Sequence, residues 1–225
     1  MTFNCEFCKR GFSKEKTWYN HACEKKRRWM NRDTAAGRLA FQAWYRFHEL
    51  SGMRTYKKIT QEDFIQSSFY GAFSKFAHYI QDIDAIAPRA FIDYVIRNNI
   101  PVDRWCQESL YLHYVRDLVS TEHSDDAMTR TIEWLSNWAS SNNQSWNEFF
   151  RVVNTSIGTM AICNGRISPW VFYNAQSSVD FLQRCTPEQV SMIQNWAPTH
   201  VWQMKFKNNQ QDCDFVRSML AQAGI

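Results

Sequence analysis

Glycine and proline are scarce in this chain of 225 residues, with 7 Gly and 5 Pro. Because the turns of sandwiches and barrels use these residues heavily, their scarcity argues against an all-β fold. Long apolar runs are missing too, since stretches such as 160–163 fall far below the roughly 18–20 residues that cross a bilayer. The N-terminus is polar and basic, without the apolar region of a signal peptide. We therefore expect a soluble, helical protein with no membrane partner.

Motifs of common enzyme classes are missing as well. The sequence contains no glycine-rich phosphate-binding pattern, no G-x-S-x-G and no H-E-x-x-H. Cys106 and His113 are seven residues apart and could share a helix face as a thiol–imidazole pair. A buried cysteine and a partly exposed histidine are the simpler interpretation. We expect no catalytic activity, and an enzyme acting on nucleic acid through an unfamiliar site stays the least favoured alternative.

The cysteines do not form a disulfide framework, because there are seven and most are scattered. Three of them lie within residues 5–23, and Cys106, Cys163, Cys185 and Cys213 lie in apolar or helical surroundings. This distribution predicts free thiols in a reducing, intracellular compartment, which could be the cytoplasm, the nucleoid or the nucleus.

Charge is distributed unevenly along the chain. Residues 1–60 hold 14 Lys and Arg against 5 Asp and Glu, a net charge of +9, whereas residues 61–225 carry −5. A mildly acidic body with a strongly basic front end favours a polyanionic partner such as DNA, RNA or an anionic surface. A solvated basic tail without a specific partner is the alternative.

Four potential metal ligands occur in the first 23 residues: Cys5, Cys8, His21 and Cys23. A C-x2-C pair followed by twelve residues and a histidine is a metal-site spacing, and these donor types suit Zn²⁺ in a tetrahedral site. So small a segment cannot bury enough apolar surface to fold alone, so metal binding would drive its folding. Four protein ligands would leave no open position, which predicts a structural site and not a catalytic one.

Residues 3–23 resemble the C2H2 zinc-finger family, in a variant whose last ligand is cysteine. Phe3, Phe12 and Trp18 stand at the apolar positions of that motif, around the Cys5–Cys8 knuckle and His21. The sequence departs from the family in having only Ala22 between the last two ligands. Residues two apart on an α-helix point about 200° apart. Both can bind one ion only if the helix ends or unwinds at 21–22, and otherwise the fourth ligand comes from elsewhere.

The resemblance also implies residues that would contact nucleic acid. In DNA-binding members the helix reads bases from just before its start and from its third and sixth positions, which here are Lys14, Thr17 and Asn20. Lysine can pair with guanine and asparagine with adenine. Basic side chains that would contact phosphates follow nearby: Lys16, Lys25, Lys26, Arg27 and Arg28. One finger reads about three base pairs, so we expect weakly specific, salt-sensitive binding.

The rest of the chain predicts helix after helix. Apolar spacing indicates a helix capped by Asp33 that runs to about residue 48, then a linker over 52–58. A capping box at Thr60 opens a helix that carries the apolar positions 69–80. Further helices are expected from Pro88, from Pro101, over 125–139, from a capping box at Ser145, from Pro169 and Pro187, and over 211–222. Alternation over 201–206 also favours a short strand.

Together these patterns predict a mainly α protein: a zinc finger with basic extension over 1–28, a linking helix and linker over 29–58, and an all-α domain over 59–225. The 10 tryptophans would anchor the helical core, or stack on bases where exposed. The favoured function is a non-enzymatic nucleic-acid-binding accessory or regulatory protein, with DNA preferred over RNA. The body would bind a protein partner or self-associate. The alternative is an adaptor or assembly component whose finger docks onto protein.

Overall fold

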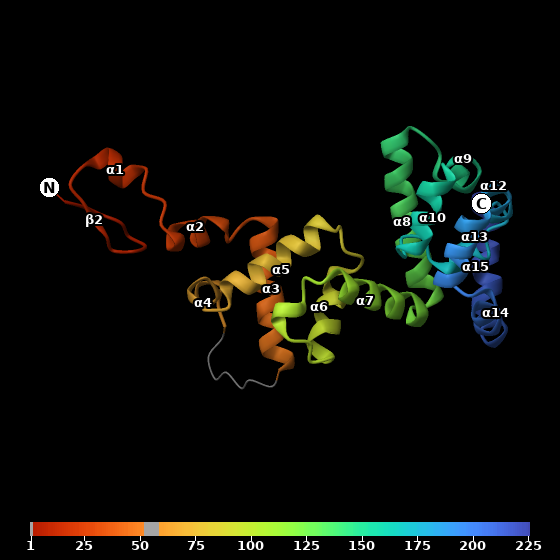
Figure 1. Ribbon diagram of the computed structural model, residues 1–225, viewed down its shortest axis with the longest axis horizontal. Helices are drawn as coiled ribbons and strands as arrows, with labels where there is room; N and C mark the ends of the chain where they lie inside the picture. Colours follow the sequence, from red (N-terminus) through yellow and green to blue (C-terminus); the bar gives the residue numbers. More distant parts are fainter. Residues whose placement is uncertain (1, 52–58) are drawn as a thin grey trace. The chain divides into compact units, whose positions relative to one another are not determined.

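The computed structural model describes residues 2–51 and 59–225, and within them the protein is mainly α (Figure 1). The only strands of this described part form one two-stranded hairpin. The chain divides into two compact units, Met1–Tyr111 and Leu112–Ile225. The expected boundaries near residues 28 and 58 both fall inside the first unit. The linker expected over 52–58 lies outside the described residues.

The first unit begins with the hairpin and continues with helices. Its elements are β1 (Phe3–Asn4), β2 (Gly11–Phe12), α1 (Glu15–Tyr19), α2 (Glu24–Asn31), α3 (Ala35–Leu50), α4 (Gln61–Gln66), α5 (Tyr70–Asp82), α6 (Pro88–Arg97) and the 3-10 turn η1 (Val102–Arg104). Helix α7 (Glu108–Thr121) contains the boundary between the units.

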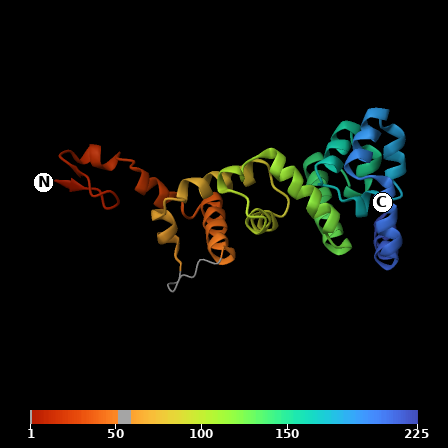
Figure 2. The same cartoon turned by 60° about the horizontal axis from the view of Figure 1, so that its bottom comes forward.

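The core of the first unit forms where α3 crosses α5 and contacts α6 (Figures 1 and 2). Ala40 and Ala43 are fully buried on α3, and such small side chains allow the helix backbones to approach closely. Next to this crossing, the ring of Trp105 lies 5.4 Å from Phe73 and 4.9 Å from Phe76, measured between ring centroids. The buried Trp105 Nε1–H donates to the carbonyl of Ile100 at 2.8 Å, so its polar atom is satisfied.

Several helix limits in this unit differ from the sequence-based predictions. Thr34, not Asp33, caps α3, because the Thr34 hydroxyl accepts the Gly37 N–H at 3.0 Å. The capping box at Thr60 is confirmed, but its helix ends at Gln66 and a new one starts at Tyr70. The helix at Pro88 is confirmed. After Pro101 the chain first makes a 3-10 turn, and α7 begins only at Glu108.

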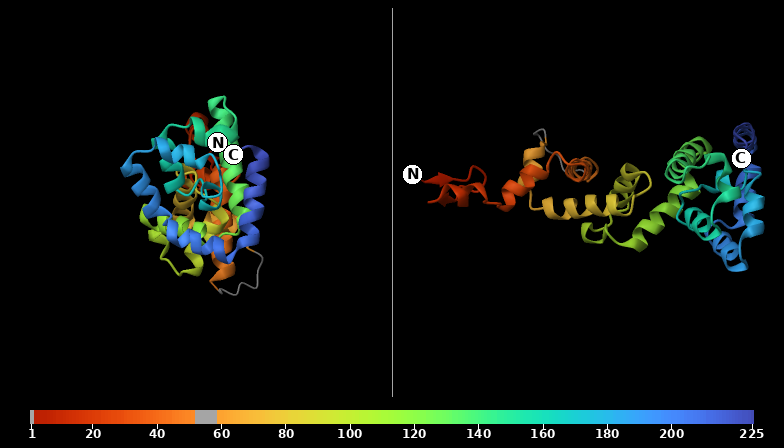
Figure 3. Two further views of the ribbon diagram at one scale, coloured as in Figure 1. Left: turned by 90° about the vertical axis from the view of Figure 1, so that its right-hand side faces the viewer. Right: turned by 90° about the horizontal axis from the view of Figure 1, so that it is seen from above.

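The second unit is entirely helical (Figure 3). Besides the end of α7, its elements are α8 (Ser124–Asn142), the 3-10 turn η2 (Trp146–Glu148), α9 (Phe149–Val152), α10 (Thr155–Cys163), α11 (Pro169–Phe172), α12 (Ser178–Arg184), α13 (Pro187–Trp196), α14 (Thr199–Asn208) and α15 (Gln210–Ala223). A buried polar cluster holds α8 against the segment before α11. In it, Glu122 accepts from Arg130 at 2.8 Å and from the Ser168 hydroxyl at 2.7 Å.

Two predictions for this unit are wrong. The segment 201–206 is helical, because Trp202 and Phe206 lie one turn apart on α14, where both rings contact Trp170. Ser145 makes no capping bond and precedes a 3-10 turn, since its hydroxyl bonds the Asn147 side chain instead. The helices predicted to start at Pro169 and Pro187 are confirmed, and the structure adds a capping box at Thr186. The helices predicted over 125–139 and 211–222 are confirmed within three residues at each end.

Candidate metal centre

The N-terminal hairpin forms a tight turn that carries the first two cysteines. Phe3 pairs with Phe12 and Asn4 with Gly11, so Cys5 follows β1 directly and Cys8 lies in the turn. The turn is closed by the Cys5 N–H, which donates to the Arg10 carbonyl at 2.9 Å, and by the Lys9 N–H, which donates to the Cys5 carbonyl at 2.8 Å. These bonds hold both thiols on one side of the knuckle.

Four donor atoms converge beside this turn. The sulfurs of Cys5, Cys8 and Cys23 and a ring nitrogen of His21 all lie within 4.8 Å of one another. The Cys5 and Cys23 sulfurs are 3.9 Å apart, and the Cys8 sulfur is 3.2 Å from His21 Nε2. A tetrahedron with metal–sulfur distances of about 2.3 Å and metal–nitrogen distances of about 2.0 Å has edges of roughly 3.5–3.8 Å. The four side chains are therefore placed to bind one metal ion.

The short spacing between His21 and Cys23 is accommodated because the helix ends before it reaches them. Helix α1 stops at Tyr19, and the His21 N–H bonds the Trp18 carbonyl at 3.1 Å in the last turn. Residues 21–23 continue in a non-helical conformation until α2 begins. The sequence predicted that both ligands could face one ion only with such a break, and this prediction is confirmed.

Backbone N–H groups favour the thiolate at the first ligand. The N–H groups of Cys8 and Phe7 lower the pKa of Cys5, and their effect exceeds that of desolvation. At Cys8 the N–H of Arg10 lowers the pKa, but burial and the neighbouring thiols of Cys5 and Cys23 leave it raised overall. Thiolates this close together repel one another, and a bound cation would remove that repulsion.

Cys23 also caps the next helix. Its sulfur accepts the Lys26 N–H at 3.4 Å at the start of α2, where the helix dipole favours negative charge. The same residue is therefore part of the donor cluster and of the basic helix. This second role could not be predicted, because the sequence alone defines no helix over the basic run.

Aromatic side chains support the module with little burial. The ring of Phe12 lies 4.7 Å from His21, Phe3 stacks on Trp18 at 5.8 Å, and Trp18 Nε1–H donates to the Asn4 carbonyl at 3.1 Å. These are the apolar positions predicted from the sequence. In the described residues up to 31, Cys5 is the only one that is buried.

The residues predicted to contact nucleic acid fall into two groups. Lys14 is the N-cap of α1, Thr17 lies on this helix, and Asn20 ends it. These three, with Lys16, Lys25 and Arg27, are exposed, while Lys26 is half-buried. Arg28 is different, because Nη1 of its guanidinium donates to the Ile65 and Ser67 carbonyls at 3.1 and 3.3 Å.

Arg28 thus docks α2 onto the helical part of the first unit. Its guanidinium also pairs with Glu24 and lies 4.6 Å from the centre of the Tyr70 ring. Trp29, the next residue of α2, contacts the turn of the hairpin instead, with its ring 5.4 Å from Phe7, and lies beneath the Arg32 guanidinium at 3.6 Å. The sequence did not predict this docking role of Arg28, since its carbonyl partners lie up to 39 residues away.

The remaining cysteines lie apart from this cluster and are less acidic than free cysteine. Burial raises the pKa of the thiols of Cys106, Cys163, Cys185 and Cys213. A raised pKa leaves the thiol protonated and weakly nucleophilic near neutral pH. All four thiols are free, as expected, but only that of Cys213 is buried and the other three are half-buried.

Comparison with known proteins adds no relative. No protein-family model, curated protein or solved structure matches the chain. Among the described helices, none combines the length and the apolar character needed to cross a membrane.

Proposed function

We propose that Cys5, Cys8, His21 and Cys23 bind one structural Zn²⁺, and that the module around them binds nucleic acid. The donor set supports zinc, because three thiolates and one imidazole in a closed cluster are typical ligands of structural zinc sites. Zinc would hold β1, β2 and the start of α2 together, where aromatic contacts alone bury little. The proposal includes no catalytic step.

The observation that carries the nucleic-acid proposal is a set of uncompensated positive charges next to the metal cluster. In the described part of the chain, none of these side chains has an ion-pair partner: Lys14, Lys16, Lys25, Lys26 and Arg27. Such charges attract phosphates without the cost of breaking internal pairs. DNA is preferred over RNA on the resemblance of α1 to a reading helix.

Fluorescence anisotropy with labelled single- and double-stranded DNA across a salt series tests this proposal. If the five free cations contact phosphates, the log–log slope of affinity against salt is about −4.5. The double variant Lys25→Gln/Arg27→Gln is expected to make the slope shallower by about 2. Lys207→Gln, an exposed lysine on α14, is the matched control and should leave it unchanged. Absence of binding to the zinc-loaded protein at low salt would exclude DNA, and RNA would be titrated next.

A protein-docking role is the second candidate, and a specific observation favours it. Tyr19 and Met30 are 76% and 61% exposed, so the module presents apolar side chains to solvent. In the same module Arg28 already binds a backbone carbonyl of the helical part of the unit. Binding of a protein partner through such apolar side chains would change little with salt. Salt dependence therefore separates the two functions.

A further inference from the structure

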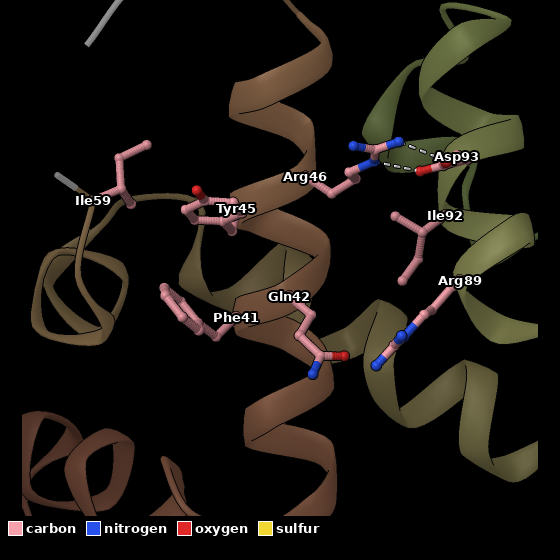
Figure 4. A pocket seen from close by; sticks show the side chains of 8 residues that line it. All are labelled: Phe41, Gln42, Tyr45, Arg46, Ile59, Arg89, Ile92 and Asp93. Atoms are coloured by element: carbon pink, nitrogen blue, oxygen red, sulfur yellow. Dashed lines mark hydrogen bonds and ion pairs between the residues drawn. The ribbon is translucent and has the colours of Figure 1, made fainter. Parts of the chain in front are cut away.

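A groove separate from the metal cluster lies on the first unit, across the exposed side of α3. It has a volume of about 560 Å³, within the range of small-molecule sites. We call it the α3–α6 groove. Its lining residues are Phe41, Gln42, Tyr45, Arg46, Ile59, Arg89, Ile92 and Asp93 (Figure 4).

One side of the groove is apolar. Figure 4 shows Phe41, Tyr45 and Ile59 together on one side of α3. The rings of Phe41 and Tyr45 are 6.2 Å apart at an angle of 59°, so they form two faces of a corner. Tyr45 remains 40% exposed, which leaves ring surface available to a ligand. Rings in this arrangement favour a flat, apolar body.

The other side of the groove carries one positive charge in excess. Arg46 is held by both oxygens of Asp93 at 2.6 and 2.8 Å and by Glu49 at 3.1 Å. Arg97 also lies 3.6 Å from Asp93, so these two arginines and two carboxylates cancel. Arg89 is outside this network and has no hydrogen-bond or ion-pair partner among the described residues.

The polar group opposite Arg89 is the side-chain amide of Gln42, which also has no hydrogen-bond partner among the described residues. Gln42 and Arg89 turn their polar ends toward one another across the gap between α3 and α6 (Figure 4). Neither side chain has a hydrogen-bond partner in the described part of the chain. A carboxylate, sulfonate or phosphate oxygen could accept from both, and a guanidinium is well suited to bind such a group.

We propose that the α3–α6 groove binds a small organic anion whose apolar rings lie against Phe41 and Tyr45 and whose anionic group pairs with Arg89. The ligand has to reach from one side of α3 to the other, a distance of about 10 Å given the width of a helix. This length corresponds to two or three rings with one charged end. The proposal does not depend on zinc or on nucleic-acid binding.

A matched pair of dyes tests both halves of the site. The anion 8-anilinonaphthalene-1-sulfonate has the required length and charge, and N-phenyl-1-naphthylamine is the same body without the sulfonate. We expect the sulfonate to bind the full-length protein with one-to-one stoichiometry in calorimetry. Backbone amide shifts in NMR spectra are expected to map to residues 41–46 and 89–93.

Variants then identify the anchor. Arg89→Gln is expected to weaken binding of the sulfonate about tenfold, by loss of a charge-assisted hydrogen bond, and to leave the uncharged dye unaffected. Arg104→Gln, another exposed arginine of the first unit, is the control and should change neither. Gln42→Trp keeps Arg89 but fills the groove, so both dyes should lose binding. Circular dichroism confirms that each variant is folded.

Three results would overturn the proposal. The first is no binding of the sulfonate to the wild-type protein, and the second is binding that Arg89→Gln changes less than twofold. The third is a set of amide shifts outside the two segments, as expected for dye adsorbed on other apolar surface. Zinc content and DNA binding are measured on the same samples, so failure of this site and failure of the metal module are distinguishable.

Discussion

Replacing Cys8 with serine is expected to weaken zinc binding by two to three orders of magnitude. Structural zinc contributes about 10–16 kcal/mol to the folding of small finger peptides, so each of four ligands accounts for roughly 2.5–4 kcal/mol. Little else holds the module, because Cys5 is its only buried residue among the described positions up to 31. Weaker zinc binding should therefore be accompanied by unfolding of β1, β2 and α1.

The assay is competition for zinc against a chromogenic chelator, with metal content measured by mass spectrometry. The wild-type protein should carry one zinc per chain, and Cys185→Ser, which removes a thiol from the second unit, should behave like the wild type. Hydrogen exchange adds a structural readout, because amides of residues 3–23 should lose protection in Cys8→Ser while those of α8 keep it. Retention of zinc within tenfold of the wild-type affinity would refute the four-ligand site.

Three further predictions concern stability. Burial lowers the pKa of His48 from its ordinary 6.5, so the folded protein favours the neutral imidazole and the free energy of unfolding should fall as the pH drops below 6.5. His48→Leu should make the free energy of unfolding in urea more nearly equal at pH 7.5 and 5.5. Gly37→Ala should destabilise by about 1–3 kcal/mol, since its methyl group would lie 2.0 Å from the Asn31 carbonyl oxygen, whereas Gly71→Ala meets nothing within 4 Å and should raise Tm. Arg130→Met should cost about 3 kcal/mol in urea unfolding because it leaves the Glu122 carboxylate buried and unpaired, and a loss below 1 kcal/mol would contradict this account.

Features of the fold that depend on neighbouring residues could be predicted from the sequence. The capping box at Thr60 involves side chains three residues apart and forms as expected, and the predicted helix with Pro187 in its first turn forms too. Ser145 shows the limit of the same rule, because its hydroxyl donates to the Asn147 side chain and the Glu148 N–H bonds the Ser145 carbonyl and not its hydroxyl. Residue type and spacing identify the candidate N-caps of a helix. The hydrogen bonds formed with neighbouring residues decide which candidate caps it.

Periodicity failed where one pattern fits two structures. The alternation of Trp202, Met204 and Phe206 suits a strand, but Trp202 and Phe206 are also four apart, as on one face of a helix. Contact of both rings with Trp170, more than 30 residues away, selects the helix. The sequence of residues 201–206 alone does not reveal this contact with Trp170.

The candidate metal site could be predicted almost completely, whereas its attachment to the body could not. Cysteine and histidine at fixed spacing indicate ligands directly, and the break in α1 before His21 followed from the need for both late ligands to face one ion. Arg28, in contrast, looked like one of four equivalent basic residues. Its role is set by carbonyls of residues 65 and 67, which its own segment does not reveal.

Cys23 makes metal binding and the position of the basic side chains interdependent. Its sulfur belongs to the donor cluster and also accepts the Lys26 N–H that starts α2. If this proposed zinc ion is removed, α2 stays joined to the hairpin only by the chain and by contacts such as that of Trp29 with Phe7, although every lysine and arginine is retained. Chelation is therefore expected to weaken salt-dependent binding of nucleic acid by the protein. A solvated basic tail would bind equally well with and without the metal, so equal affinities would show that charge alone, and not the zinc module, attracts the polyanion.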